Sequence, residues 1–260
     1  MERLVDLDIT AKHIAVITLN RPEAANAMSK ALLDELNFVI EDINANNDIF
    51  CSIITGANDK VFCAGADLKE RTGMSNDEVI AAVQYISKTV EKIAKMPMPV
   101  IAALNGVAFG GGLELALACD VRIAAHHAKM ALPETSLAII PGAGGTQRLA
   151  RLIGPGQAKR LIYTASSIHA DEALQIGLVE KVVSSDDLKN ESLKMAKTIA
   201  KNGPLALRQA KKAIDRGMQT DLAAGLYIEQ QCYKKTIPTE DRLEGLTAFQ
   251  EKRTPKYKGI

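Results

Sequence analysis

The chain has 260 residues, of which 47% are hydrophobic and 24% are charged, and its formal net charge is +1. This balance is typical of a globular protein with a sizeable core, and the near-neutral charge predicts no general attraction to nucleic acid or to an anionic membrane. The absence of tryptophan and the aromatic content of only 4% also leave few surfaces on which nucleic-acid bases could stack.

Strand signals dominate the first half of the chain. Runs rich in β-branched residues occur at residues 14–20, 50–56 and 121–125, and a further run follows the prolines of MPMPVIAALNG. Each run is short and ends at glycine, proline, asparagine or a polar turn, as buried strands do.

Helical periods lie between these strands. Apolar residues at helical spacing fill residues 28–43 and 79–93, and Ser75 with Glu78 forms a predicted capping box ahead of the second helix. LELALACD (113–120) predicts a third helix. Strands that alternate with helices in this way predict a layered α/β fold.

After about residue 150 the pattern becomes mostly helical, and the stretch from GPLALRQAKKAIDRG onward has no strand signal. We expect two regions, a strand-rich core over residues 1–195 and a helical region over residues 196–260. A helical region of this kind often packs on a partner subunit.

The cysteines and the opening segment indicate the compartment. Four scattered cysteines sit among small or apolar neighbours, which is typical of reduced thiols and not of disulfides or a zinc site. The segment MERLVDLDITAKH has no apolar signal core, and no apolar run approaches membrane-spanning length. We therefore expect a cytoplasmic protein without a membrane partner.

Several chemistries lack their motifs. The chain has no Gly-Lys pair and therefore no P-loop, and PGAGGTQRL carries Gln147 where a dinucleotide fingerprint needs its last glycine. It has no G-x-S-x-G elbow, and its four histidines show no metal-ligand spacing.

Two glycine-rich turns remain as candidates for anion binding. FCAGADLKER (62–71) follows a predicted strand, and Gly110, Gly111 and Gly112 lead directly into a helix. Free N–H groups at such turns, together with the helix dipole, favour negative charge and could supply two donors to one oxyanion. Tight packing is the alternative reason for the glycines, and Asp67 could simply cap a short helix.

Two glutamates accompany these turns. Glu114 lies in an otherwise apolar helix, and Glu134 stands between apolar residues in MALPETSLAIIPGAGG. Burial of a carboxylate is costly unless it is partnered or its pKa rises. An acid–base pair is one interpretation; a core acid paired with arginine at Glu114 and a first-turn helix residue at Glu134 are the others.

The motifs AGADLKE, NGVAFGGGLELALACD, A-x-x-A-x-M-x-L-P-E and IPGAGGTQRLARLIG resemble, in order and spacing, those of the crotonase (enoyl-CoA hydratase/isomerase) family. The resemblance extends from ITLNRPEAANAM to RLEGLTAFQEKR, and LAIIPG and TIPTEDRLEGLTAFQEKRTPKYKG are most similar to the AU-binding methylglutaconyl-CoA hydratase subgroup. It implies a spiral of ββα turns and a C-terminal helical region that forms trimers, commonly stacked into hexamers. It also implies acyl-CoA substrates and no cofactor or metal, since coenzyme A is part of the substrate.

The same resemblance assigns site residues. Ala66 and Gly111 match the backbone N–H donors of the oxyanion hole, and Glu114 and Glu134 match the two catalytic acids of the hydratases. Lys252 would reach the coenzyme A of a neighbouring subunit. The residues that would line the coenzyme A arm and its adenine end are Ala24, Ala25, Asn26, Ala64, Asp67, Leu68 and Lys69.

The presence of both acids favours a hydro-lyase that adds water across the 2,3 double bond of a 2-enoyl-CoA. The substrate would be 3-methylglutaconyl-CoA in leucine degradation or a short-chain enoyl-CoA in fatty acid β-oxidation. Ala138 stands where many short-chain hydratases carry glycine, and the methylglutaconyl subgroup shares this alanine. The alternatives are an isomerase of the same fold and an RNA-binding relative that uses the cations of LRQAKKAIDRG. Because the net charge is only +1, we expect no nucleic-acid partner.

Overall fold

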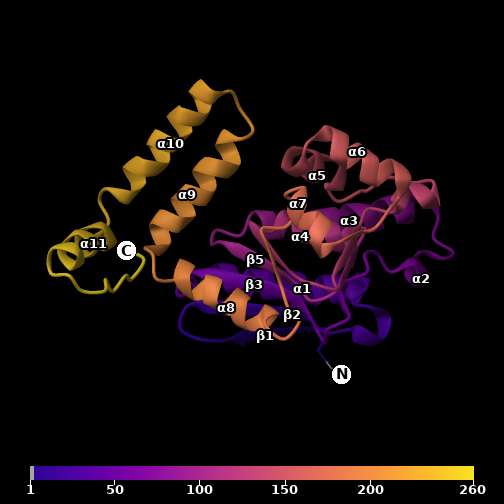
Figure 1. Ribbon diagram of the computed structural model, residues 1–260, viewed down its shortest axis with the longest axis horizontal. Helices are drawn as coiled ribbons and strands as arrows, with labels where there is room; N and C mark the ends of the chain where they lie inside the picture. The colour runs from indigo at the N-terminus through magenta and orange to yellow at the C-terminus, as the bar shows by residue number, and fades with distance from the viewer. Residues whose placement is uncertain (1–2) are drawn as a thin grey trace.

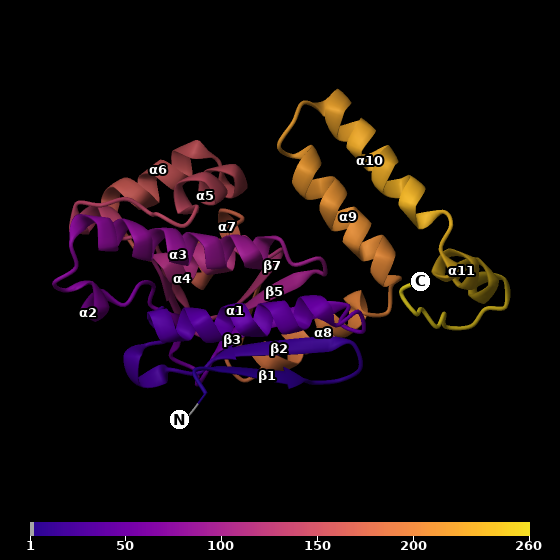
Figure 2. The same cartoon turned by 180° about the vertical axis from the view of Figure 1, so that it is seen from behind.

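The computed structural model describes residues 3–260. A layered body of two sheets and surrounding helices carries a helical arm that projects from one side (Figures 1 and 2). The α/β class predicted from the alternating periods is confirmed.

A six-stranded sheet forms the centre of the body, in the order β1-β2-β3-β5-β7-β10. β1 is antiparallel to β2, and every other pair is parallel. Parallel neighbours require crossover connections, which is why helices separate these strands in the sequence. The strands are β1 (Val5–Ile9), β2 (Ile14–Leu19), β3 (Cys51–Gly56), β5 (Val100–Leu104), β7 (Val121–Ala125) and β10 (Lys181–Val183).

A second, four-stranded sheet has the order β4-β6-β8-β9. Its strands follow those of the first sheet one by one: β3 leads to β4, β5 to β6 and β7 to β8, and helices come after each pair. The chain therefore winds in successive ββα turns, as the family resemblance implied. The strands are β4 (Val61–Cys63), β6 (Val107–Phe109), β8 (Lys129–Ala131) and β9 (Ile168–His169).

Helices cover both faces of the large sheet. Successive strand residues point to opposite sides, and apolar side chains on both sides are buried against helices. Ile54 packs with α1, α3 and α4, whereas its neighbour Ile53 packs under α8 with Leu188. The predicted capping box is present: Ser75 Oγ accepts from the Glu78 N–H, and Glu78 accepts from the Ser75 N–H. The body's helices are η1 (Pro22–Ala24), α1 (Lys30–Ala45), α2 (Leu68–Arg71), α3 (Asn76–Ala94), α4 (Gly111–Ala118), η2 (Glu134–Leu137), α5 (Gly145–Ile153), α6 (Pro155–Thr164), α7 (Ala170–Gln175) and α8 (Leu188–Ile199).

The arm consists of α9 (Pro204–Gly217), α10 (Leu222–Thr236) and α11 (Glu240–Gln250). α9 and α10 form a hairpin (Figure 1), which Lys211 anchors to the body through a 2.8 Å ion pair with Asp120. The predicted boundary at residues 195–196 falls inside α8, which packs on the sheet, so the arm begins only after that helix.

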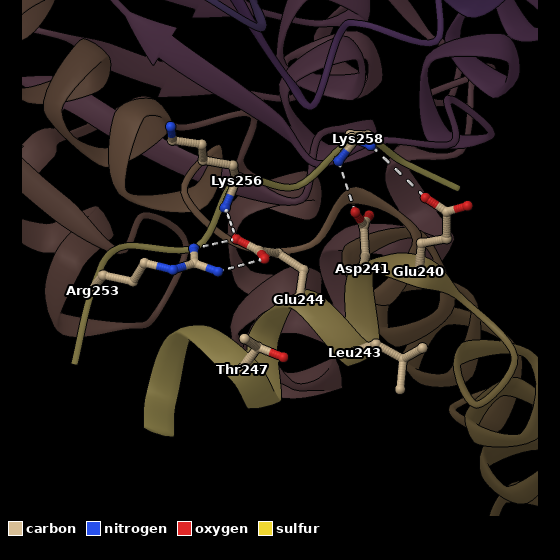
Figure 3. Close-up of a pocket in the computed structure, with 8 residues that line it drawn as sticks. All are labelled: Glu240, Asp241, Leu243, Glu244, Thr247, Arg253, Lys256 and Lys258. Atoms are coloured by element: carbon tan, nitrogen blue, oxygen red, sulfur yellow. Dashed lines mark hydrogen bonds and ion pairs between the residues drawn. The ribbon is translucent and has the colours of Figure 1, made fainter. Parts of the chain in front are cut away.

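The C-terminal tail folds back along α11 (Figure 3). Glu244 receives two hydrogen bonds from the Arg253 guanidinium, at 2.6 and 2.8 Å, and Asp241 accepts the N–H groups of Lys258 and Gly259 at 2.7 and 2.8 Å. These contacts hold the tail as a strap across the last helix. Within residues 3–260, no helix is long and apolar enough to cross a bilayer.

Candidate active site

The first turn of α4 lies tightly against the ends of β4 and β8. The Gly110 N–H donates to the Ala131 carbonyl at 2.9 Å, and a Cβ on Gly112 would stand 2.0 Å from the Cys63 carbonyl oxygen. Gly110 has φ of 51°, a conformation that side chains with a Cβ rarely adopt. The predicted packing reason for these glycines is therefore real, and it places the N-terminus of α4 at the edge of the small sheet.

Two backbone N–H groups meet beside this turn. A Cβ on Gly65 would lie 3.1 Å from the Gly111 nitrogen, and one on Gly111 would lie 3.8 Å from the Ala66 nitrogen. The backbone of Met28 pairs with the residues on either side of Ala66. Its N–H donates to the Gly65 carbonyl, and its carbonyl accepts from the Asp67 N–H. Among residues 3–260, neither the Ala66 nor the Gly111 N–H donates to a protein acceptor, so both remain available to an anion at the positive end of α4.

Glu114 is buried one turn into α4, with 3% of its surface exposed. Its Oε1 atom accepts hydrogen bonds from the Ala143 and Gly145 N–H groups, both at 2.7 Å. Burial raises the pKa of this carboxyl group, while the two N–H donors and the charge of Arg148 act against the rise. No described arginine forms an ion pair with it, so the core acid–arginine interpretation is wrong; the start of α5 holds this acid.

Glu134 is the second acid, at the first position of η2. A Cβ on Gly110 would lie 3.0 Å from its Oε1 atom, and its Oε2 atom is buried without a hydrogen-bond partner among the described residues. Burial, and then the charge of Glu114, raises the pKa of Glu134 to about 7. The two acids therefore differ in environment. Two N–H donors favour the ionised form of Glu114, whereas burial favours the protonated form of Glu134.

The residues predicted to line coenzyme A come together beside the oxyanion turn. The Ala64 N–H donates to the Ala25 carbonyl at 3.0 Å, which joins the two segments predicted for the adenine end and the arm. Ala64, Leu68 and Lys69 are exposed and Ala24 is half-buried.

The side chains of Asn26 and Asp67 point into the protein. Asn26 is fully buried; its amide donates to the Val61 and Phe62 carbonyls at 3.1 Å and accepts from the Arg21 N–H at 2.9 Å. Asp67 accepts from the Arg21 guanidinium at 2.6 Å and from the Lys69 N–H at 3.0 Å, so the predicted cap is confirmed. These two side chains shape the loop, and any ligand contact of theirs would come from the backbone.

Lys252 is the one predicted residue that a single chain does not bring to the others. It follows α11 on the arm, whereas α2 lies at the opposite end of the molecule (Figures 1 and 2). The side chain is exposed, and its role toward a neighbouring subunit stays a prediction.

Sequence reasoning missed the groups that hold the acids and the loop. Arg21, Ala143 and Gly145 were not predicted as parts of the site, although all three contact predicted residues. The available signal was the Gly-Gly pair of PGAGGTQRL, since a glycine-rich entry into a helix exposes N–H groups. The pair was excluded as a dinucleotide fingerprint and matched to a crotonase motif, and neither interpretation gave its N–H groups a role.

The candidate RNA-binding stretch on α9 has four cations, and two of them contact the body of the protein. Lys211 is 9% exposed and pairs with Asp120, and Arg208 contacts Asn47 at 3.3 Å. Two of its cations therefore do not form a free basic surface.

The fold is a spiral of ββα turns, in which the free N–H of Ala66, after β4, lies near the free N–H of Gly111, at the start of α4. This combination defines a protein of the crotonase class. The family model described as enoyl-CoA hydratase/isomerase matches residues 10–260. The chain belongs to this family.

Similar proteins agree with this assignment. YngF of Bacillus subtilis, which its name places among the enoyl-CoA hydratases/isomerases, is 57% identical over 249 residues, 96% of each chain. The mitochondrial methylglutaconyl-CoA hydratase of Homo sapiens is 47% identical over 261 residues, 99% of this chain and 77% of its own. The crystal structure of an enoyl-CoA hydratase from Bacillus anthracis superimposes with a TM-score of 0.98 at 54% identity, covering 99% of this chain and all of that one.

Proposed function

We propose that the protein is an enoyl-CoA hydratase, a hydro-lyase that adds water across the 2,3 double bond of a 2-enoyl-CoA. The observation that carries the proposal is the pairing of two acids in contrasting environments, the buried Glu114 and the half-buried Glu134, beside two free N–H donors. Such a pair supplies a base and an acid at the same pH.

The Ala66 and Gly111 N–H groups would bind the thioester oxygen of the substrate. As water attacks C3, the electron pair of the double bond moves toward C2 and the carbonyl, and negative charge gathers on this oxygen. Two preorganised donors and the α4 dipole stabilise the enolate without reorganisation.

Glu114 would act as the general base. Its Oε1 atom is held by two N–H groups, while Oε2 accepts no hydrogen bond from the described residues and is left to orient the water. It takes a proton from the water as the C–O bond forms. Glu134, whose pKa burial raises to about 7 and whose Oε2 atom has no hydrogen-bond partner among the described residues, gives its proton to C2. Each acid exchanges its proton state with solvent before the next turnover.

Coenzyme A is part of the substrate in this scheme, and no cofactor or metal takes part. Its arm would run along Ala64 and residues 66–69, with the adenine end near residues 24–26. Lys252 would contribute from a neighbouring subunit.

Assembly into a homotrimer or a hexamer belongs to the proposal. Large apolar side chains are exposed on the arm, among them Met218 at 77% and Phe249 at 84%, and surfaces of this kind mark protein contacts. A cytoplasmic location is also proposed, and the four cysteines, all free and buried, support a reducing compartment.

The similarity to the human methylglutaconyl-CoA hydratase makes 3-methylglutaconyl-CoA the first substrate to test, with a short-chain enoyl-CoA as the alternative. Steady-state hydration of 3-methylglutaconyl-CoA and crotonyl-CoA, followed by loss of the conjugated-thioester absorbance, separates them. A higher kcat/KM for the first places the protein in leucine degradation; preference for crotonyl-CoA places it in β-oxidation. No hydration of either would refute the proposal, and a rise in absorbance from a 3-enoyl-CoA would identify an isomerase.

A further inference from the structure

Arg148 lies in the first turn of α5, the helix whose entry holds Glu114. Its Nη1 atom donates to the Ala143 carbonyl at 2.9 Å, and its Nη2 atom pairs with Oε2 of Glu91, on α3, at 2.7 Å. The Arg148 side chain is half-buried, with 25% of its surface exposed. One guanidinium therefore joins the turn before α5 to a helix residue 57 positions earlier in the chain.

The adjacent glycines of this turn make room for the two side chains that meet it. A Cβ on Gly144 would stand 2.1 Å from Nη1 of Arg148, and a Cβ on Gly145 would stand 3.0 Å from Oε1 of Glu114. The guanidinium and the carboxyl group therefore lie against consecutive residues of the same turn.

The backbone of the turn connects Arg148 to Glu114. Ala143 gives its N–H to Glu114 and its carbonyl to the guanidinium, so both of its hydrogen-bonding groups are occupied. The Gly144 carbonyl, which shares a peptide group with the Gly145 N–H, accepts from the Arg148 N–H at 2.8 Å. Hydrogen bonds in such a chain polarise and strengthen one another, so these contacts fix both N–H groups that hold the acid.

The charges around Glu114 agree with this arrangement. The charge of Arg148 lowers the pKa of Glu114 against the effect of burial, and the charge of Glu114 in turn raises the pKa of Glu134, on η2. On α3, Glu91 also pairs with Lys95 at 3.2 Å. Arg148 is thus the cation that favours the ionised base, and Glu91 is the anion that holds this cation in place.

We propose that Arg148 is a positioning residue for the general base: it holds residues 143–145 so that both N–H groups point at Oε1 of Glu114 and leave Oε2 to the water. This assignment rests on the proposed hydratase function. The guanidinium acts through the turn and through its charge, and not on a reacting atom. Because a displacement of about 1 Å can cost roughly 100-fold in rate, the contact should affect kcat more than KM.

The test compares R148Q with R151Q, which removes an exposed cation of the same helix that contacts Gln147. Hydration is followed across pH with whichever of crotonyl-CoA and 3-methylglutaconyl-CoA the wild-type enzyme hydrates faster. R148Q should lower kcat roughly 10- to 100-fold with little change in KM. The acidic limb of its pH profile should move to higher pH, because a base without its cation binds a proton more tightly. R151Q should change neither.

Two further variants separate positioning from packing. R148K keeps the charge but offers one ammonium group in place of a two-armed guanidinium, so its acidic limb should stay near that of the wild-type enzyme while kcat falls part of the way. E91Q removes the ion pair between α3 and α5 but leaves the bond to the Ala143 carbonyl. It should lower the melting temperature and reduce kcat much less than R148Q does.

Carbon-13 NMR of labelled glutamate carboxyl groups, with E114Q to assign the signal, follows the base directly. A Glu114 titration and an acidic limb that are unchanged in R148Q would overturn the assignment. So would a raised KM at wild-type kcat, or equal losses of kcat in R148Q and E91Q in proportion to their losses of stability. A wild-type enzyme that hydrates neither thioester would instead refute the proposed function, and the NMR titration would still decide whether Arg148 controls the proton affinity of Glu114.

Discussion

Gly110 leaves room for the carboxyl group of Glu134: a Cβ atom on the glycine would stand 3.0 Å from Oε1 of that group. The same glycine begins the helix that carries Glu114 and Gly111. One backbone position therefore sets the spacing between an acid and an oxyanion donor, and it does so with a φ of 51°.

Gly110→Ala should lower the activity more than the stability of the protein explains. The backbone conformation costs alanine on the order of 1–3 kcal/mol, and the new methyl group displaces the Glu134 carboxyl group, so kcat should fall while KM changes less. Steady-state kinetics and thermal unfolding measure the two effects. The control is Gly156→Ala in α6, where a Cβ meets nothing within 4 Å and should be tolerated. A fully active G110A enzyme would contradict this spacing.

Glu114→Gln should abolish most activity at little cost in stability. The amide oxygen can still accept from the Ala143 and Gly145 N–H groups, but the side chain no longer takes a proton from water. Loss of a general base lowers kcat by roughly 10²- to 10⁴-fold. Unchanged KM and a melting temperature near that of the wild-type enzyme are expected. If the melting temperature fell sharply, the lost activity would reflect misfolding.

The pKa of Glu134, about 7, predicts how activity and stability depend on pH. As a general acid it must be protonated, so kcat should decline as pH rises through 7. Because its pKa in the folded protein exceeds the ordinary glutamate value of 4.5, the folded protein binds the proton more tightly than the unfolded chain does. The resulting stabilisation of the folded protein is fully present below about pH 4.5 and is lost as pH rises to about 7.

Glu134→Gln provides the check on this pH dependence. In this variant the residual kcat should no longer decline as pH rises through 7. The free energy of unfolding should also lose the pH dependence that Glu134 gives it between pH 4.5 and 7. A wild-type kcat that stays flat as pH rises through 7, from about one unit below that value to about one unit above it, would show that Glu134 does not titrate there.

Asn26→Ala should destabilise the protein by roughly 2–3 kcal/mol, because it removes the hydrogen bonds of a fully buried amide to the Arg21 N–H and the Phe62 carbonyl. The Val61 carbonyl keeps a second donor, the Asn105 amide, at 3.1 Å. The loop that presents Ala66 should loosen, and kcat should fall with the stability. Urea unfolding measures the first effect. Asn202→Ala is the control: this exposed side chain donates one 3.4 Å hydrogen bond to the Thr198 carbonyl, and its loss should change stability by less than about 0.5 kcal/mol. Similar effects of the two variants would show that Asn26 does not hold the loop.

Long, periodic elements of the fold were predictable from the sequence. The helical periods over residues 28–43 and 79–93 became α1 and α3, and the β-branched runs became β2, β3, β5 and β7. β4, β6 and β8 were not predicted, because three residues contain too little alternation to show a period. β1 and β10 were also missed, and β10 lies in the part of the chain where helical periods prevail.

The sequence by itself determined which chemistry the site can contain. The first N–H groups of a helix have no partner within the helix, and glycines leave them accessible. An acid buried among apolar residues either receives hydrogen bonds or has a raised pKa. Those features depend on neighbours along the chain, and they were readable as Gly111, Glu114 and Glu134.

Only the tertiary structure decided what each acid does. Glu114 receives its donors from residues 29 and 31 positions away, whereas the Oε2 atom of Glu134 is buried without a donor among the described residues. Such partners are set by the winding of the ββα turns and not by local sequence. The physical reason is that burial and hydrogen bonding to distant segments control the proton affinity of a carboxyl group.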